Sequence, residues 1–240
     1  MLSKSQIKLI KSLSHKKYRQ RENLFIAEGI KVIQEFLDTG LQLHLLITSG
    51  EFFQPEVSPR VVVSEAELQK ISLLTTPQRA VALFEIPEAA VPSEKGLQVV
   101  LDQVRDPGNL GTIIRLCDWF GVTDLICSPD TVDCFNPKVV QASMGSLARV
   151  KVHYRDLAEF LKHQKRPVFG TFLDGEDIYK EVLPADGILV MGNEANGITP
   201  GTEAYITKRL TIPQFGDKRE TESLNVATAT AIVLSEFRRG

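Results

Sequence analysis

The sequence predicts an α/β protein with a small N-terminal α/β unit and a larger unit whose parallel sheet is covered by helices on both faces. In the second half, short and almost continuously apolar runs alternate with helical patterns, which is typical of parallel sheets buried on both faces. Residues 87–96 combine two prolines with small and charged residues, which indicates a boundary. We therefore predict units over residues 1–88 and 97–240, joined by a linker over 89–96.

The N-terminal unit is predicted from short patterns of both kinds. Ile7, Ile10 and Leu13 recur at helical spacing, and Gly40 ends a later helical pattern. Residues 15–23 are polar and basic, which indicates a loop. Expected helices span residues 3–14, 28–39 and 65–72, and expected strands span 24–26, 43–48, 61–63 and 80–86.

The C-terminal unit is predicted from its regular alternation of elements. The last helix is expected to begin at Ser223, whose hydroxyl is a suitable N-cap, with Glu220 and Glu222 just ahead, where the helix dipole favours carboxylates. Ligands bind parallel sheets at the carboxyl ends of the strands, so the loops there are the candidate site. Expected strands span residues 97–102, 124–127, 150–153, 167–172, 187–191 and 210–212, and expected helices span 110–120, 137–148, 155–164, 201–207 and 223–238.

The composition argues against several classes of protein. The chain is 43% hydrophobic and 24% charged, which is ordinary for a globular protein. No apolar run is long enough to span a bilayer, and the first residues lack the apolar core of a signal peptide. The three cysteines and four histidines follow no metal-ligand spacing. We therefore expect a cytoplasmic protein with reduced thiols, no bound metal and no membrane segment.

Basic charge is concentrated at the start of the chain. Residues 1–31 hold eight Lys or Arg and two Glu, for a net charge of +6, whereas residues 32–240 carry a net charge of −8. The basic segment fits either an electrostatic contact with a polyanion or an ordinary solvated helix face. Composition alone does not separate these two alternatives.

The first candidate loop follows the strand that ends at residue 102. Pro107, Gly108, Asn109 and Gly111 precede Arg115, which is expected to lie near Asn109 at the start of a helix. Glycines let a ligand approach the backbone, and the amides at a helix N-terminus favour an anion. The alternative is a capped turn with a surface arginine, since the GxGxxG spacing of a dinucleotide site is absent.

The second candidate loop, at residues 190–197, follows the most apolar strand of this half. Gly192 would permit close contact with a ligand, and Asn193, Glu194 and Asn196 supply polar side chains. A buried strand that ends in such a cluster is expected at a ligand crevice. An ordinary turn rich in Asn and Gly is the alternative.

The third candidate segment, residues 210–237, joins a short strand to a charged loop and a long helix. Ser223 and Asn225 stand at the expected helix start, and the run of Ala and Thr over residues 227–231 would let another backbone pack closely. The alternative is a helix that only packs on the sheet.

Together the three segments resemble the SpoU/TrmH family of RNA ribose 2′-O-methyltransferases, of the SPOUT class. The N-terminal unit, through FIAEGIKVIQEFL, resembles more loosely the L30e-like substrate-binding domain that many members carry. The matching motifs are Asn109-x-Gly111-x-x-x-Arg115, Gly192-Asn193-Glu194-x-x-Gly197, and Ile212-Pro213 followed by Ser223-Leu224-Asn225-Val226-Ala227.

The resemblance implies a C-terminal trefoil knot, a homodimer and S-adenosylmethionine as the cofactor. It implies that RNA is the substrate, with rRNA favoured over tRNA. The cofactor-binding positions it indicates are Thr171, Leu173, Gly192, Asn193, Ile212, Leu224, Asn225 and Ala227, and the catalytic positions are Asn109, Arg115, Glu194, Ser223 and Asn225.

The resemblance also assigns roles to charged residues. Arg115 is the implied activator of the ribose hydroxyl, and we favour phosphate anchoring and charge stabilisation because arginine stays protonated. In the N-terminal unit, basic residues beside Tyr18 are expected to contact RNA phosphates: Lys16, Lys17, Arg19 and Arg21. The alternatives are a non-catalytic RNA-binding protein that keeps this fold and a small-molecule nucleotide enzyme.

Overall fold

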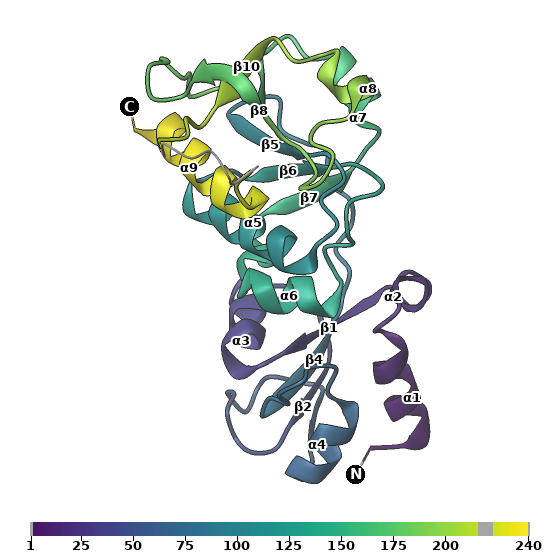
Figure 1. Cartoon of the computed structure of the whole chain (residues 1–240). Coiled ribbons are helices and arrows are strands. Elements are labelled where there is room, and N and C mark those ends of the chain that lie inside the picture. Colours follow the sequence, from purple (N-terminus) through teal and green to yellow (C-terminus); the bar gives the residue numbers. More distant parts are fainter. Residues whose placement is uncertain (1, 216–222, 240) are drawn as a thin grey trace. The chain divides into compact units, whose positions relative to one another are not determined.

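The structure is a computed structural model that describes residues 2–215 and 223–239. The chain forms two compact units (Figure 1). The first unit contains residues 1–89 and 133–149, and the second contains residues 90–132 and 150–240. Residues 133–149, which the predicted division assigned to the C-terminal unit, therefore pack with the N-terminal unit.

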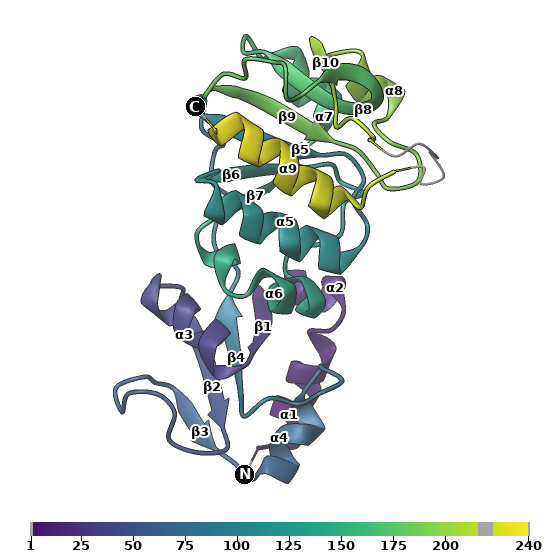
Figure 2. The same ribbon diagram turned by 60° about the vertical axis from the view of Figure 1, so that its left-hand side comes forward.

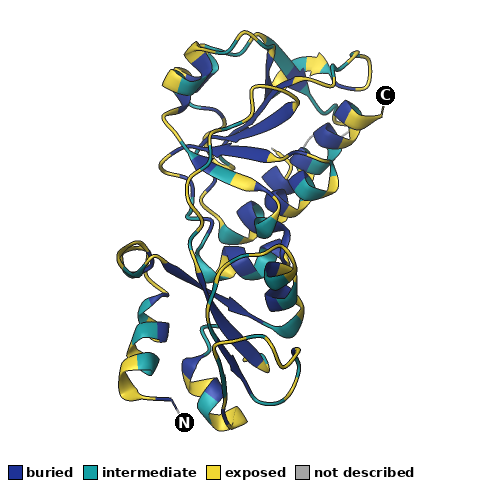
Figure 3. Cartoon of the chain, turned by 180° about the vertical axis from the view of Figure 1, so that it is seen from behind, coloured by how far each residue is buried: buried dark blue, intermediate teal, exposed yellow. Residues whose placement is uncertain are grey.

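A four-stranded mixed sheet forms the centre of the first unit, with the order β1-β4-β2-β3. Strand β4 runs antiparallel to β1 and β2, and β3 runs parallel to β2. Strands β1 and β4 are almost entirely buried because both faces of the sheet are covered (Figure 3). The strands are β1 (Leu24–Glu28), β2 (Leu43–Thr48), β3 (Arg60–Val62) and β4 (Ala80–Glu85).

Helices pack on both faces of this sheet. Apolar residues of α1 and α4, such as Ile10 and Leu68, join one buried cluster, and Phe36 of α3 joins the other. Helices α1 and α4 each begin with a capping box, at Ser3 and Ser64, which satisfies free amides of the first turn. The helices are α1 (Lys4–Ser12), α2 (Lys16–Glu22), α3 (Ile30–Asp38) and α4 (Glu65–Ile71).

Helix α2 corrects the prediction of a loop over residues 15–23. Its Arg19 is only 2% exposed. The guanidinium donates to the Asp133 carboxylate at 2.5 Å and to the carbonyls of Leu13 and Ser14 at 2.7 and 3.0 Å. The predicted contact of Arg19 with an RNA phosphate is therefore wrong, because its charge is buried and already paired.

The segment 133–149 completes the core of the first unit. Phe135 packs against Phe25 of β1 with ring centroids 4.8 Å apart, and Val140 lies in the same cluster. The predicted single helix over 137–148 is instead split into α6 (Pro137–Ser143) and a 3₁₀ turn, η1 (Ser146–Ala148). The split follows from positive φ angles at Met144 (51°) and Gly145 (95°), which end an α-helix.

The second unit contains a six-stranded parallel sheet, as predicted, with the order β10-β8-β9-β5-β6-β7. The chain runs outward from β5 through β6 to β7 and then crosses to the other side of β5. The strand order thus reverses between β5 and β9, and ligands commonly bind beside such a reversal, at the carboxyl ends of the strands. The strands are β5 (Leu97–Leu101), β6 (Asp124–Cys127), β7 (Lys151–Tyr154), β8 (Val168–Asp177), β9 (Gly187–Met191) and β10 (Lys208–Thr211).

Helices cover both faces of this sheet. Helices α5 (Pro107–Trp119) and α9 (Val226–Arg238) lie side by side on one face (Figure 2). Helices α7 (Leu157–Lys162) and α8 (Pro200–Glu203) lie on the other, where Leu157 and Leu161 of α7 pack against Val100 and Val190 of the strands. No helix in the described parts of the chain has the length and hydrophobicity needed to cross a membrane.

The buried pair of Arg19 and Asp133 generates the first prediction. Asp133→Ala removes the carboxylate and leaves the guanidinium buried, so we expect the free energy of unfolding to fall by about 3 kcal/mol. Arg21→Ala is the control on the same helix, because the Arg21 side chain is 64% exposed, and it should cost less than about 0.5 kcal/mol. Urea denaturation of both variants measures the difference, and equal losses would contradict the prediction.

Candidate functional site

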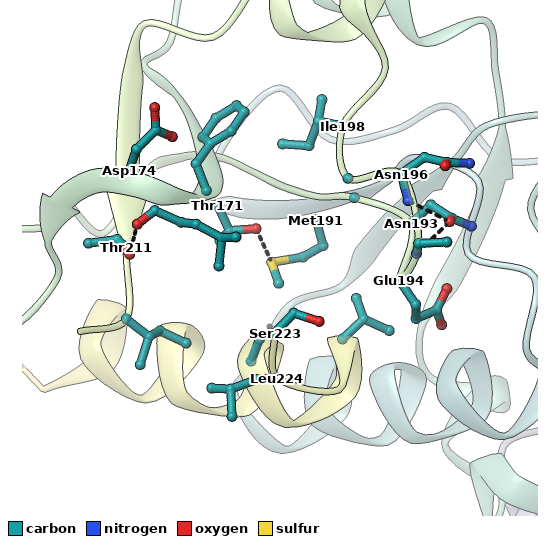
Figure 4. A pocket seen from close by; sticks show the side chains of 18 residues that line it. Thr171, Asp174, Met191, Asn193, Glu194, Asn196, Ile198, Thr211, Ser223 and Leu224 are labelled. Atoms are coloured by element: carbon teal, nitrogen blue, oxygen red, sulfur yellow. Dashed lines mark hydrogen bonds between the residues drawn. The ribbon is translucent and has the colours of Figure 1, made fainter. Parts of the chain in front are cut away.

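Residues of the second unit enclose a cavity of about 500 Å³ at the carboxyl edge of its sheet (Figure 4). This volume falls within the range of small-molecule sites. Four stretches of chain line it, together with two residues of α9. The lining comprises residues 171–174 of β8, residues 191–198 at and after β9, Thr211 and Ile212 at the end of β10, Ser223 and Leu224 before α9, and Val226 and Ala229 of α9 itself.

One wall of the cavity is an irregular stretch of β8. Gly170 pairs with Arg209 of β10, but the next paired residue of β8 is Glu176, opposite Leu210. Residues 171–175 therefore leave the regular pairing with β10, and we call them the β8 excursion. The excursion ends at Gly175, which lies against the backbone of Leu210. A Cβ on Gly175 would lie only 2.5 Å from the Leu210 carbonyl carbon. The departure of these residues from the ladder exposes Thr171 to Asp174 to the cavity.

The opposite wall is the loop after β9, and the Asn193 side chain closes it. Its carbonyl oxygen accepts hydrogen bonds from the amides of Ala195 and Asn196 at 2.9 and 3.2 Å. The Asn193 and Gly197 backbones also bridge each other, with two hydrogen bonds of 2.9 Å. A Cβ on Gly192 would lie 2.3 Å from the Gly197 carbonyl carbon. Glycine at 192 is thus required by the fold of the loop itself, independently of any ligand.

Residues at the end of β5 form hydrogen bonds to this loop. The Asn193 amide donates to the Gln103 carbonyl at 2.7 Å, and the Ser128 hydroxyl accepts from the Gln103 amide at 2.9 Å. Gln103 has a φ of 60°, which is uncommon for a residue with a side chain. The buried Asp102 carboxylate accepts from both the amide and the hydroxyl of Thr199, at 2.8 and 2.7 Å. The β9 loop is therefore fixed at both of its ends.

Helix α9 begins later than predicted. Asn225 is its N-cap, and the side-chain oxygen accepts from the amides of Ala227 and Thr228 at 3.0 and 3.2 Å. Ser223 is therefore not the N-cap, because it lies two residues further out and lines the cavity instead. Glu220 and Glu222, predicted to interact with the helix dipole, lie outside the described residues.

A chain of side-chain hydrogen bonds joins three of the predicted catalytic residues. The Asn109 amide donates to the Glu194 carboxylate at 2.6 Å, and the Asn225 amide donates to the Asn109 carbonyl at 2.9 Å. Asn109 is placed by the first turn of α5, where its own backbone amide donates to the N-cap Asp106 at 2.8 Å. Residues from three separate segments of the chain thus form one polar cluster beside the cavity.

Arg115 makes no hydrogen bond to this cluster. Helix α5 begins at Pro107, so Arg115 lies more than two turns along it and six residues beyond Asn109, a separation that turns the two side chains to different sides of a helix. Arg115 therefore lies further into the helix than predicted, and the expectation that it acts together with Asn109 stays a prediction. Arg115 is exposed, does not line the cavity, and makes no hydrogen bond or ion pair with any residue the structure describes.

The predicted cofactor positions divide into two groups. Asn225 and Ala227 do not line the cavity. Asn225 caps α9, and Ala227 is a buried residue of that helix. Val226 and Ala229 line it in their place. Sequence reasoning also missed Phe172, Asp174, Met191 and Ile198, although the first two directly follow a predicted lining residue. The positions that do line the cavity are Thr171, Leu173, Gly192, Asn193, Ile212 and Leu224.

The composition of the lining fits a nucleoside with a polar tail. Apolar side chains such as Met191, Ile198 and Val226 suit an aromatic base, while the Asn193–Gly197 loop and the Ser223 hydroxyl supply polar groups. No group of His, Cys, Asp and Glu within the described ranges could hold a metal ion. The fold and the cavity together define an α/β protein with a nucleoside-sized cavity at the carboxyl edge of a parallel sheet.

Comparison with known proteins gives the family. The model of the SpoU rRNA Methylase family matches residues 96–235, and the model of the MRM3-like substrate binding domain matches residues 4–82. The chain is 30% identical to the 23S rRNA (guanosine(2553)-2′-O)-methyltransferase RlmP of Bacillus subtilis, over 97% of this chain and 96% of the relative. This chain belongs to the SpoU rRNA methylase family.

Solved structures agree with this assignment. A protein of the TrmH family from Porphyromonas gingivalis, described as a candidate RNA methyltransferase, is 43% identical, with a TM-score of 0.92 over 100% of this chain and 99% of that one. The AdoMet-bound rRNA methyltransferase from Sinorhizobium meliloti is 32% identical, with a TM-score of 0.87 over 100% of this chain and 96% of that one.

The tight β9 loop generates the second prediction. In Gly192→Ala the new Cβ collides with backbone atoms, so the loop must open, and we expect a loss of about 2 kcal/mol in stability. We also expect faster hydrogen–deuterium exchange at residues 193–198. Gly201→Ala is the control, because a Cβ there meets nothing within 4 Å. Unchanged exchange in Gly192→Ala would show that the loop does not depend on this glycine.

Proposed function

We propose that this protein is an S-adenosylmethionine-dependent methyltransferase that methylates a ribose 2′-hydroxyl of RNA, with rRNA as the substrate class. The observation that carries the proposal is the hydrogen-bonded cluster of Glu194, Asn109 and Asn225 beside a nucleoside-sized cavity. This arrangement supplies both a cofactor pocket and polar groups beside it. The relative from Bacillus subtilis is named for the 2′-O-methylation of a guanosine in 23S rRNA, which supports rRNA over tRNA.

The cavity lining would hold the cofactor. Gly192, Ile212 and Leu224 come from three separate segments and face one space, so their backbones can hold an adenosine together. The β8 excursion, with Thr171 and Leu173, would form another wall. S-adenosylmethionine supplies an electrophilic methyl group on a positively charged sulfonium.

The polar cluster would hold the ribose. A 2′-hydroxyl is a weak acid, so the protein must align its oxygen and stabilise the negative charge that develops on it. The amide of Asn109 and the hydroxyl of Ser223 can orient the ribose, and Glu194 fixes the amide of Asn109 through their 2.6 Å hydrogen bond. The side-chain amide of Asn225 donates to the side-chain carbonyl oxygen of Asn109 and so fixes the orientation of Asn109 as well. The cluster therefore presents a fixed set of donors and acceptors to the substrate.

Arg115 would act on the RNA rather than on the cofactor. Its guanidinium remains protonated at neutral pH and is a poor general base. It is exposed and lies outside the cavity lining, so we assign it to anchoring an RNA phosphate and stabilising charge near the reacting oxygen.

Helix α2 of the first unit would contact the RNA. Lys17 Nζ and Arg21 Cζ each lie 4.8 Å from the centre of the Tyr18 ring, so two cations flank one aromatic side chain. Such a group can bind phosphates and stack on an unpaired base. Lys16 is exposed on the same helix. Buried Arg19 would hold the helix in place and would not bind RNA itself.

Further features that the family resemblance implies remain predictions. They are the trefoil knot, the cytoplasmic location, and the division of labour between an L30e-like substrate domain and a methyltransferase domain. The homodimer is also a prediction, and one observation supports it. Trp119 is 83% exposed and lies one turn after Arg115, on the same side of α5. A second copy that covered this side would bury an aromatic side chain next to the proposed phosphate anchor.

The proposed reaction is tested by transfer of a labelled methyl group from S-adenosylmethionine to rRNA, followed by mapping of the modified ribose. Arg115→Ala should lower the rate of transfer at least a hundredfold, because the variant loses a charge that acts mainly in the transition state. Its affinity for S-adenosylhomocysteine should stay within about twofold. Arg239→Ala, at the exposed end of α9, is the control. Wild-type rates in Arg115→Ala would refute the role of Arg115, and no transfer by the wild-type protein to any rRNA would refute the proposed function.

The proposed RNA contact is tested by point variants. Deleting residues 1–90 would expose the apolar side chains of Phe135 and Val140, which pack in the core of the first unit. A loss of RNA binding in that deletion could then come from misfolding instead of from a lost RNA contact. The double variant Lys17→Ala and Arg21→Ala should weaken RNA binding about tenfold and flatten its dependence on salt. Lys70→Ala, a single exposed lysine on α4, should have a much smaller effect. Equal RNA affinity and an equal salt slope in the double variant and the wild type would remove α2 from the RNA contact.

A further inference from the structure

The β8 excursion is a wall of the cavity that the sheet does not hold. Residues 171–175 have no partner in the β8–β10 register. Two threonine hydroxyls link the excursion to neighbouring segments. The Thr211 hydroxyl donates to the Leu173 carbonyl at 3.2 Å, and the Thr171 hydroxyl lies 3.5 Å from the Val190 carbonyl. A stretch with so little support from the ladder needs other contacts to keep one shape.

Arg209 supplies the strongest of these contacts. It stands on β10 opposite Gly170, the last residue of β8 that is paired before the excursion. Its guanidinium carbon lies 3.5 Å from the centre of the Phe172 ring, which is the distance of a close cation–π contact. One guanidinium nitrogen also donates to the Asp174 carboxylate at 2.6 Å. Arg209 therefore contacts two residues of the excursion, and both of them line the cavity.

Gly170 makes this arrangement possible. A Cβ at Gly170 would lie 2.7 Å from the Phe172 ring and 2.3 Å from Ile206. The ring thus lies over a position without a side chain, and Arg209 lies over the ring. Phe172 belongs to the edge of the buried cluster that includes Ile198 and Ile206. The ring is held between this cluster and the guanidinium, so its position at the cavity depends on both.

The charges around Arg209 favour the same arrangement. The hydrogen bond from Arg209 holds the pKa of the Asp174 carboxyl below its usual value, so Asp174 stays anionic and continues to attract the guanidinium. Another guanidinium nitrogen donates to Glu203 of α8 at 2.5 Å. The two carboxylates draw the planar group in two directions, which fixes its orientation over the ring.

We propose that Arg209 is a positioning residue that shapes the cofactor pocket, because it clamps Phe172 and Asp174 of the β8 excursion, and that Phe172 is the aromatic wall the adenosine contacts. This inference rests on the proposed function, since it assigns a nucleoside to the cavity. None of the three motifs that indicated the family contains Phe172, Asp174 or Arg209. The inference thus adds a fourth group of residues to the cofactor site.

The neighbouring lysine provides a matched control. Lys208 also stands on β10 and also bridges two carboxylates, Glu176 and Glu181. Neither of these carboxylates lines the cavity. Removal of the charge at 208 or at 209 therefore costs comparable surface ion pairs, but only position 209 touches the cavity wall.

The test is binding of S-adenosylhomocysteine and of adenosine by isothermal titration calorimetry, with no RNA present. Arg209→Met should raise both dissociation constants about tenfold, and Phe172→Leu should do the same. Lys208→Met should change them less than twofold. The double variant Arg209→Met and Phe172→Leu should bind little worse than either single variant, because both remove one shared contact. Glu203→Gln, which breaks only the link to α8, should cost less than threefold.

A second measurement needs no ligand. Amide hydrogen exchange of residues 171–175 should be faster in Arg209→Met than in the wild type, and unchanged in Lys208→Met. If Arg209→Met does not fold, Arg209→Lys replaces it. That variant keeps the charge near Asp174 but loses the planar face, and its dissociation constants should rise about threefold.

The outcomes separate the two levels of the argument. If the wild-type protein binds neither ligand, the proposed function fails and this inference fails with it. If the wild type binds both and Arg209→Met binds equally well, the inference alone is overturned. Equal losses in Arg209→Met, Lys208→Met and Glu203→Gln would also overturn it, because they would show a general effect of the sheet edge.

Discussion

The organisation of the site depends on how the Asn193 side chain closes the loop after β9. Its oxygen accepts from two amides of its own loop, and its amide donates to the carbonyl of Gln103 at the end of β5. These bonds turn Glu194 toward Asn109, which in turn holds Asn225 at the start of α9. One amide side chain thus connects the carboxyl ends of two central strands with the N-termini of two helices. These hydrogen bonds to its own loop and to Gln103 give the Asn193 side chain a structural role in addition to its place in the cavity lining.

The cavity exists because two stretches of backbone leave regular structure at the same edge of the sheet. The chain after β9 folds back on itself at Gly192 and Gly197, and this loop lines one side of the cavity. Beside it, the β8 excursion leaves the ladder with β10 and adds a second wall. Glycines make both departures possible for steric reasons. Gly192 lies against the backbone of Gly197, and Gly175 lies against that of Leu210. Each close approach excludes a side chain, and each leaves its neighbours facing the cavity.

Most of the fold could be predicted from the sequence because hydrophobic periodicity reports burial. Strands β2, β6 and β9 were predicted with the observed bounds, since apolar runs and flanking turn residues coincide there. The errors arise where tertiary contacts override local pattern. Residues 16–22 are polar enough for a loop, yet Arg19 finds a buried carboxylate 114 residues away and forms a helix around that contact. The motif glycines and amides of the site could be read from the chain, whereas the contact between Arg209 and Phe172 depends on a strand register that no local pattern contains.

Three arginines show why residue type alone does not assign a role. Arg19 is 2% exposed and paired with Asp133, so its charge is committed to the fold of the first unit. The Arg209 side chain is 38% exposed and lies on an aromatic ring between two carboxylates, so its charge shapes the wall of a cavity. Arg115 is exposed, and no residue in the described ranges pairs with it. A guanidinium that remains hydrated and unpaired retains its capacity to bind an anion. Of the three, only Arg115 has the exposed, unpaired guanidinium that the proposed contact with an RNA phosphate requires, so its surroundings support the proposal independently of its place in a motif.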